Sequence, residues 1–462
     1  MKPLLQLALP LIVVNLGQQM MAVVDTALAG RLDEVSLAAT GLGSTLFFLT
    51  SIFGIGVTLG VDPIASQAFG AGRRRHARRA MWQGVYAGLV VTVPIAAATV
   101  GLGAILEWLG VQPALAEKTR LYLHARLASI IPLMVFMACR SYLQAAQLTR
   151  PIVISTVAAN LFNLAADWIL VFGDDGLVRL GLPELGIPAL GVAGIGWATT
   201  VAATMQLAVV ALALGAEPGQ GRQPVRALDR LLLRRIFKLG IPTGLQLVSE
   251  GGIFALVSFL AGVMGSRAMA AHQVAIMLAS LSFMVPLAVG MATSVQVGRA
   301  IGRADHPGTR RAGLAGIFLG GLAMIFAALM MWVFPTGLAR IMTDQPGVVE
   351  LSAQLLIIAG AFQIFDGIQA VASGALRGAG MTRWAMTANI VAYWLIGLPI
   401  SLWLGFGLDW GPQGLWWGLT AGLFVAAAAL SVKFAAVSRR PIAPIESDQS
   451  LTPSRKVAKH AK

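Results

Sequence analysis

Long apolar runs recur along the whole chain, and they constrain its fold more than any other feature of the sequence. Each contains 20 or more residues, enough for a helix to cross a hydrocarbon core of about 30 Å. The runs cover residues 4–30, 37–60, 80–106, 121–148, 151–172, 189–214, 236–264, 268–297, 312–334, 351–375, 384–408 and 414–437. This pattern predicts an all-α polytopic membrane protein with twelve transmembrane helices.

The composition agrees with a chain that is embedded in a lipid bilayer. Hydrophobic residues make up 57% of the sequence and charged residues only 12%, about half the charged fraction of a soluble domain. The net charge of +14 does not favour a nucleic-acid partner, because the basic residues lie in short connections between apolar runs and not on one folded face. The first run has no cleavage site of the small-x-small kind, so we expect a retained first helix.

The basic residues also predict the orientation in the membrane. Most of the Lys and Arg residues follow every second apolar run, or lie at the two ends of the chain, whereas the alternate connections carry mainly Asp and Glu. The positive-inside rule then places the basic connections and both termini in the cytoplasm. We therefore expect a multi-pass protein of the cell (inner) membrane.

The two halves of the sequence repeat at a spacing of about 232 residues. Leu9-Pro10 matches Ile241-Pro242, and Gly70 matches Gly302. Because each repeat contains an even number of spans, two six-helix lobes should share one orientation and be related by a pseudo-twofold axis along the membrane normal. The predicted units are an N-terminal lobe (1–214), a cytoplasmic interlobe linker (215–235), a C-terminal lobe (236–437) and a disordered basic cytoplasmic tail (438–462).

Four acidic residues lie inside apolar runs: Asp25, Asp167, Glu250 and Asp366. A charge at the bilayer centre costs from roughly 2.5 to more than 10 kcal/mol, so intramembrane acids indicate function. Within its own span, none of the four acids has a Lys or Arg within one helical turn. We expect them to be protonated or ion-bound for part of the time.

Asn163 and Asp167 are four residues apart, so an amide oxygen and a carboxylate can approach the same ion from one helical face. The alternative is an interhelical hydrogen bond. Asp62 precedes Pro63 near a run of arginines, and its position favours a structural role as a cap or an ion-pair partner.

Two prolines, Pro10 and Pro242, occupy matching positions in the first and seventh runs. Because proline removes a backbone hydrogen bond, they are candidate hinges, and a structural kink without gating is the alternative. The sequence has no Walker A motif, which leaves an ion gradient as the energy source. We expect no cofactor.

Over residues 1–437 the sequence resembles the multidrug and toxic compound extrusion (MATE) family. The segments that carry the resemblance are Val24-Asp25-Thr26-x-x-Ala29-Gly30, Ala271-His272-Gln273-Val274, Phe365-Asp366-Gly367-x-x-Ala370 and Gly374-Ala375-Leu376-Arg377-Gly378. The Leu247-Val248-Ser249-Glu250 stretch resembles the NorM branch of that family.

The resemblance implies a V-shaped, outward-facing pair of lobes that exports small organic cations, such as amphipathic drugs and dyes, in exchange for Na⁺ or H⁺. It also implies two sites for the coupling ion. The N-lobe site consists of Asp25, Asn163, Asp167 and Thr199, and the C-lobe site of Glu250 and Asp366. Na⁺ is a candidate ligand at either site, and we expect a monomer.

Three functions other than antiport make different demands on the sequence. A lipid or lipid-linked oligosaccharide flippase should line its cavity with several basic groups, whereas the spans here hold mostly acids, with Arg126 and Arg140 as exceptions. A channel should repeat a filter segment between spans. A membrane-embedded enzyme should carry a catalytic motif, and the apolar runs have none of the His-Glu-x-x-His or Gly-x-Ser-x-Gly kind.

Overall fold

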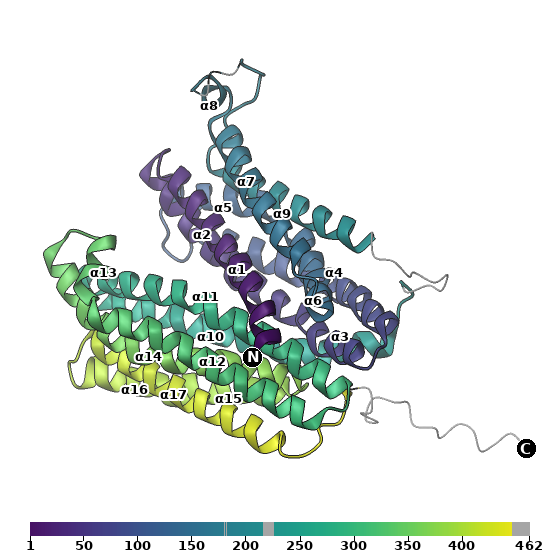
Figure 1. The fold of residues 1–462 in the computed structure, drawn as a ribbon. Helices are drawn as coiled ribbons and strands as arrows, with labels where there is room; N and C mark the ends of the chain where they lie inside the picture. The colour runs from purple at the N-terminus through teal and green to yellow at the C-terminus, as the bar shows by residue number, and fades with distance from the viewer. Residues whose placement is uncertain (180, 182, 216–225, 446–462) are drawn as a thin grey trace, which may run out of the picture.

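The chain forms two helical bundles that lie side by side (Figure 1), in a computed structural model that describes residues 1–179, 181, 183–215 and 226–445. These residues contain no β-strand. Eleven helical segments are each long and apolar enough to cross a membrane. A twelfth span is the pair α5 (Pro113–Leu127) and α6 (Ile130–Ala146), which is bent by 48°. The predicted class, a two-lobe protein with twelve transmembrane helices, is confirmed.

The first bundle, or N-lobe, is built from residues before the interlobe linker. It contains α1 (Lys2–Ala29), α2 (Glu34–Thr58), α3 (Val61–Gly70), α4 (Arg74–Ala104), α5, α6, α7 (Arg150–Phe172), α8 (Asp174–Arg179) and α9 (Val192–Gly215). Helices α2 and α3 together make the second span.

The second bundle, or C-lobe, follows the linker. It contains α10 (Arg230–Val263), α11 (Ser266–Gly302), α12 (His306–Val333), α13 (Pro335–Met342), α14 (Pro346–Gly378), α15 (Thr382–Ile390), η1 (Val391–Gly397), α16 (Leu398–Leu402), η2 (Trp403–Gly407) and α17 (Pro412–Val437). The segments from α15 to η2 form one span, in which η1 and η2 are π-helical.

Aspartate side chains fix the start of three spans. Asp33, Asp229 and Asp305 precede α2, α10 and α12, and each accepts a hydrogen bond from a backbone N–H in the first turn, at 2.7, 3.0 and 2.8 Å. Such caps satisfy backbone donors that have no partner within the helix. Lys118 also donates to Asp33 at 2.7 Å. This bond, together with the capping bond, lowers the pKa of Asp33 to about 2.

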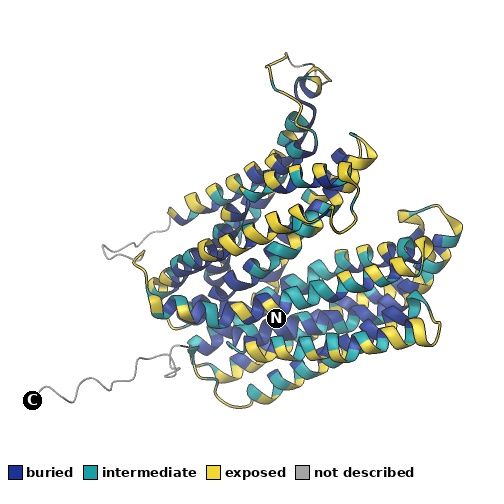
Figure 2. Ribbon diagram, turned by 180° about the vertical axis from the view of Figure 1, so that it is seen from behind, coloured by how far each residue is buried: buried dark blue, intermediate teal, exposed yellow. Residues whose placement is uncertain are grey.

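Burial follows the helix interfaces within each bundle, and the outer surfaces are apolar. Figure 2 shows buried positions between the helices and exposed positions on the outside. Large apolar side chains such as Phe259, Phe318, Phe326 and Leu212 are mostly exposed. A surface of this kind is stable in contact with lipid chains, because no polar group has to be desolvated there.

Several boundaries differ from the predicted ones. The fourth span begins at Pro113, eight residues earlier than expected, and α10 begins at Arg230, within the expected linker. Of that linker, residues 216–225 lie outside the described part of the chain, as do residues 446–462 of the expected disordered tail. The first part of the tail has defined contacts, since the backbone N–H of Ile445 donates to Gln67 Oε1 at 2.9 Å.

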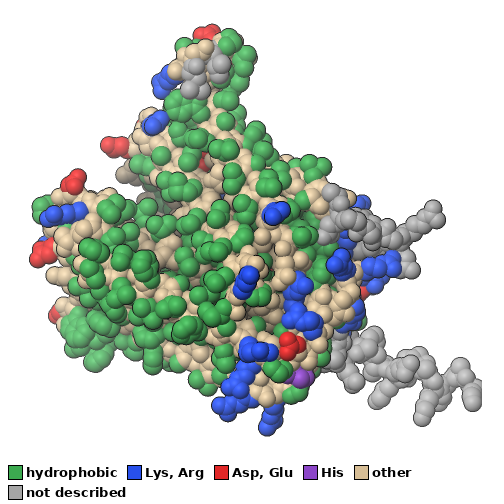
Figure 3. Space-filling model, viewed as in Figure 1, with side chains coloured by type: hydrophobic (Ala, Val, Ile, Leu, Met, Phe, Trp, Pro, Cys, Tyr) green, Lys and Arg blue, Asp and Glu red, His purple; other side chains and the backbone are tan. Residues whose placement is uncertain are grey.

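The lobes come together near α3 and diverge toward α8 and α13 (Figures 1 and 2). Lys and Arg side chains gather at the end where the lobes meet (Figure 3). We call this the arginine-rich end. The residues that define it are Arg73, Arg74, Arg75, Arg299, Arg303, Arg310, Arg311, Arg377 and Arg383.

The most extensive contacts between the lobes are those of α2 with α10, α3 with α11 and α1 with α11. The closest approach follows the sequence repeat. A Cβ atom on Gly70 would overlap the backbone of Arg299, and one on Gly302 would overlap the backbone of Gln67. Since Arg299 and Gly302 are the repeat counterparts of Gln67 and Gly70, the lobes meet through a self-complementary contact about the pseudo-twofold axis.

Candidate functional site

Three helices of the N-lobe bring four predicted residues into one buried cluster. Helix α1 carries Asp25, α7 carries Asn163 and Asp167, and α9 carries Thr199. The Asn163 amide donates to Asp25 Oδ1 at 3.0 Å and also to Asp167 Oδ2. The Thr199 hydroxyl lies 3.2 Å from Asp25 Oδ2. The structure therefore places all four residues of the N-lobe group in one connected cluster.

This cluster is rich in oxygen atoms that have no hydrogen donor. Asn163 Oδ1 and Asp167 Oδ1 are buried and have no hydrogen-bond partner. The Thr199 hydroxyl has one proton, and its Oγ1 also lies 2.9 Å from the Ile195 carbonyl. Two neighbouring carboxyl groups repel each other when both are ionised. A shared proton, or a hard cation bound by these oxygens, removes that repulsion.

An arginine from a fourth helix faces the cluster. The Arg126 guanidinium of α5 interacts electrostatically with both Asp25 and Asp167. It donates to the Tyr122 hydroxyl at 2.9 Å and lies 4.3 Å from the centre of the Phe47 ring. The two acids thus have a partial countercharge within the membrane. It comes from another helix, so it is not apparent from the residues within one turn of either acid. Arg126 itself was visible in the sequence as a rare basic residue in a span.

In the C-lobe, Glu250 of α10 sits in a network of amide side chains. Gln246 and Gln369 donate to Glu250 Oε1 at 3.0 and 2.8 Å. Gln246 also donates to Ser373, and Gln369 to Asn389, at 2.8 and 2.9 Å. These donors hold the carboxylate in one orientation between α10, α14 and α15.

Asp366 of α14 is the second acid of this lobe. It is buried and lies close enough to Glu250 for their charges to interact. Tyr393, in the π-helical segment η1, is also within electrostatic range of both acids. Because π-helical turns often occur at functional sites, this segment adds a feature that the sequence pattern did not reveal.

Sequence reasoning missed the amide residues around Glu250, although part of the signal was present. Gln246 precedes Glu250 by four residues, and Gln369 follows Asp366 by three, the spacings at which side chains share a helix face. The two acid clusters are not repeat counterparts, since the residue 232 positions after Asp25 is Val257. The structure keeps the clusters in separate lobes.

The other candidate residues lie away from these clusters. Pro10 and Pro242 are both inside continuous helices, so neither proline ends its helix. Asp62 is buried on α3. Within the described residues, no group of three or more His, Cys, Asp or Glu side chains has the arrangement of a metal site. A sodium ion would therefore need amide, hydroxyl or backbone oxygens beside the carboxylates.

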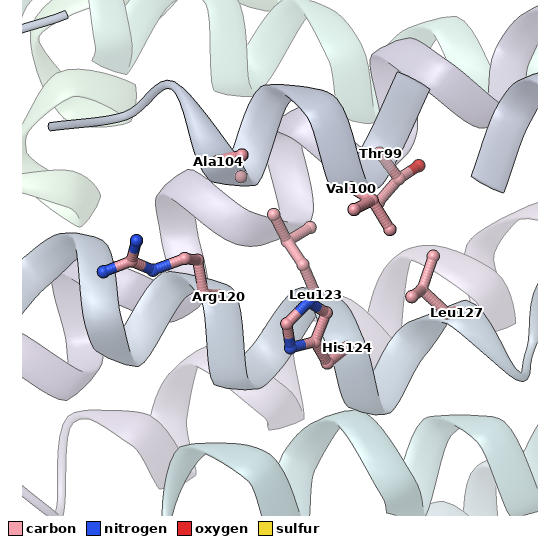
Figure 4. A pocket seen from close by; sticks show the side chains of 8 residues that line it. Thr99, Val100, Ala104, Arg120, Leu123, His124 and Leu127 are labelled. Carbon is pink, nitrogen blue, oxygen red and sulfur yellow. The ribbon is translucent and has the colours of Figure 1, made fainter. Parts of the chain in front are cut away.

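A cavity of about 190 Å³ lies between α4 and α5 (Figure 4). Thr99 and Val100 line it from α4, and Arg120 and His124 from α5. Arg120 is paired with Glu107 at 2.5 Å. None of the candidate coupling residues lines this cavity.

The sequence matches the family model described as MatE in two segments, residues 10–169 and 242–403. The segments begin 232 residues apart, which is the spacing of the internal repeat. The chain is 36% identical to a probable multidrug resistance protein NorM of Bradyrhizobium diazoefficiens, over 94% of this chain and 93% of that protein. It is 33% identical to a multidrug resistance protein NorM of Vibrio vulnificus, over 93% and 94% of the two chains.

Solved structures with the same fold include a eukaryotic MATE transporter, AtDTX14, and the MATE transporter VcmN of Vibrio cholerae in its bent form. The TM-scores are 0.83 and 0.82, each at 22% sequence identity. In both comparisons 95% of this chain and 97% of the other chain are covered. The likeness therefore extends over both lobes.

Proposed function

Since the chain belongs to the MatE family, whose members are transporters and not enzymes, we propose that it is a secondary active multidrug efflux antiporter. It exports cationic amphipathic compounds in exchange for Na⁺ or H⁺ by alternating access. The observation that carries this proposal is the buried cluster of Asp25, Asn163, Asp167 and Thr199. It offers two carboxyl groups and unpartnered oxygens to a small cation.

The N-lobe cluster supports ion coupling because its charge depends on what it binds. With a proton or Na⁺ bound between Asp25 and Asp167, the pair carries less negative charge, so its burial in the low-dielectric region costs less free energy while the lobes change conformation. Glu250 and Asp366 are a second candidate pair in the C-lobe. Moving one charge through 100 mV supplies about 2.3 kcal/mol, which supports roughly a fiftyfold concentration ratio. One coupled ion is enough for useful efflux.

The acidic residues of the two lobes also support a cationic substrate. The acids inside the spans attract organic cations, and the relatives are named multidrug resistance proteins. Competition between drug and ion for carboxylates links the two fluxes, because a bound cation of either kind neutralises the site. We propose small organic cations as substrates and a monomer as the working unit.

The proposed orientation places the arginine-rich end in the cytoplasm of the cell (inner) membrane. The positive-inside rule supports it, and both termini then lie on the cytoplasmic side. The lobes meet at that end and diverge at the other (Figure 1), as expected for an outward-facing state. In this proposal residues 1–214 and 236–437 move as the two lobes, with 215–235 as the connection between them.

Efflux of a fluorescent cationic dye from proteoliposomes tests this function. A Na⁺ gradient and a proton gradient are imposed separately, and dye release is followed for the parent protein, Asp25→Asn and Asp366→Asn. We expect gradient-driven efflux in the parent protein and a loss of at least about tenfold in both variants, since each neutralises a coupling acid. Asp175→Asn, which changes an exposed acid, is the matched control.

Full efflux by both Asp25→Asn and Asp366→Asn would contradict the assigned roles of these acids. Efflux under neither gradient, with correctly folded protein, would contradict the antiporter and favour a lipid flippase of the same architecture.

A further inference from the structure

Asp62 is a buried carboxylate that the proposed coupling sites do not use. It lies on α3, at the arginine-rich end where the lobes meet, and only 1% of its surface is exposed. The Ser141 side chain of α6 interacts with the carboxylate, but no donor reaches either carboxylate oxygen with good hydrogen-bond geometry. A buried ion with so little hydrogen bonding is strongly unfavourable unless opposite charges compensate it.

Two arginines, one from each lobe, carry the opposite charge near Asp62, although neither forms an ion pair within 4 Å of it. Arg140 of α6, in the N-lobe, and Arg377 of α14, in the C-lobe, both lie within electrostatic range of Asp62. Arg140 is 4% exposed and Arg377 is half-buried. The attraction between Asp62 and Arg377 therefore acts across the interface between the lobes.

Direct contacts hold these helices against one another. Next to Arg377, the carbonyl of Gly378 accepts a hydrogen bond from Gln67 Nε2 of α3 at 3.2 Å. On the N-lobe side, Arg140 Nη2 donates to Asn15 Oδ1 at 3.0 Å and lies 3.3 Å from the Met291 sulfur of α11. Arg140 thus contacts both lobes.

Opening of the arginine-rich end would separate these charges. If α3 moved away from α14, Asp62 would lose the guanidinium that approaches it from the other lobe, and water would have to replace that interaction. We propose that Asp62, Arg140 and Arg377 form an interlobe charge bridge that stabilises the closed arginine-rich end and breaks when this end opens. The inference rests on the alternating access of the proposed function. Asp62 acts in it as a positioning residue and touches neither drug nor coupling ion.

The distance between the lobes at this end tests the bridge. Arg75 and His306, exposed residues on α4 and α12, are each replaced by cysteine in a Cys139→Ala background and spin-labelled. The distance between the two labels is then measured by double electron–electron resonance in lipid nanodiscs. We expect Asp62→Asn and Arg377→Gln each to raise the ratio of open to closed molecules about tenfold, a typical effect for directly coupled residues. The double variant should open no further than the larger single effect, because both substitutions remove the same bridge.

Arg383→Gln, an exposed arginine at the same end, should keep the parent distances, and so should Asp62→Glu, which keeps the charge. Because Arg377 also lies within electrostatic range of Glu250, Glu250→Gln is the control that separates its two partners. Arg377→Gln then tests the bridge from the C-lobe side even if Asp62→Asn does not fold. The bridge would be overturned if Arg377→Gln kept the distances of the parent protein. It would also be overturned if the change in the open-to-closed ratio of the double variant equalled the product of the changes in the two single variants. Dye efflux by the parent protein decides the proposed function separately, because the distance measurement does not depend on transport.

Discussion

The Asn163 amide lies between two acids that would otherwise repel each other. It donates to Asp25 and Asp167, while its own oxygen has no hydrogen-bond partner. One side chain thus organises the carboxylates and offers a neutral oxygen to a cation. The Thr199 hydroxyl completes the group from α9. In this account, binding of the coupling ion depends on uncharged side chains as well as on the acids.

Removal of the Thr199 hydroxyl should therefore weaken ion binding without changing the charge of the site. For Thr199→Val we expect a loss of about 1 kcal/mol, so the ion concentration for half-maximal dye efflux should rise roughly fivefold. Thr199→Ser should behave like the parent protein. Thr200→Val is the matched control, since the Thr200 hydroxyl donates to the Ala125 carbonyl at 2.9 Å. An equal shift in both Val variants would show that Thr199 has no special role.

At the residue scale, sequence reasoning found the acids but not all of their surroundings. Asp25, Asn163, Asp167 and Thr199 were expected together, and the structure brings them together. Arg126 was not expected beside them, because hydrophobic periodicity says which residues lie in a span but not which helices are neighbours. The donors around Glu250 were missed for the same reason, although their spacing along the helices was visible.

At the scale of elements, the closed end depends on small residues in α3 and α11. Gly70 and Gly302 allow the α3 and α11 backbones to approach so closely that no side chain would fit. The two contacts are repeat counterparts, so each lobe presents the same small surface to the other. Close packing of this kind is common between membrane helices, where glycine permits short distances between backbones.

A methyl group at either glycine should therefore force the lobes apart. For Gly70→Ala and Gly302→Ala we expect a destabilisation of the lobe contact of about 1–3 kcal/mol. The spin-label pair at residues 75 and 306 should report a larger open population, and thermal unfolding should begin at a lower temperature. Gly41→Ala is the control, because a Cβ atom at that helical position meets no other atom within 4 Å. Parent behaviour of both Gly70→Ala and Gly302→Ala would refute the close contact.

The spans themselves were largely predictable, because a membrane-spanning helix requires a long apolar run and such runs seldom have another origin. The bend between α5 and α6 and the π-helical turns η1 and η2 were not predicted. Bends and π-helical turns depend on tertiary packing. They do not change the length or hydrophobicity of a span, so the hydropathy pattern does not reveal them. The short helices α8 and α13 were missed because each is too short to have a clear period.

At the scale of the whole molecule, two acid clusters lie in separate lobes and a charged contact joins the lobes at one end. In an antiporter, ion binding must be linked to which side is open, and the proposed bridge makes the closed state at this end depend on a specific contact. A rigid pair of lobes with ion sites alone would bind cations without moving them. The contact at the arginine-rich end gives the closed state a stability that transport has to overcome.

Ion movement driven by a dye gradient tests exchange most directly. Proteoliposomes with no initial ion gradient receive a cationic dye on one side, and the internal pH and the uptake of radioactive Na⁺ are recorded. We predict that dye moving in one direction drives protons or Na⁺ in the other, and that Asp25→Asn combined with Asp366→Asn abolishes this counterflow. Dye movement in the parent protein with neither proton nor Na⁺ flux would contradict the account.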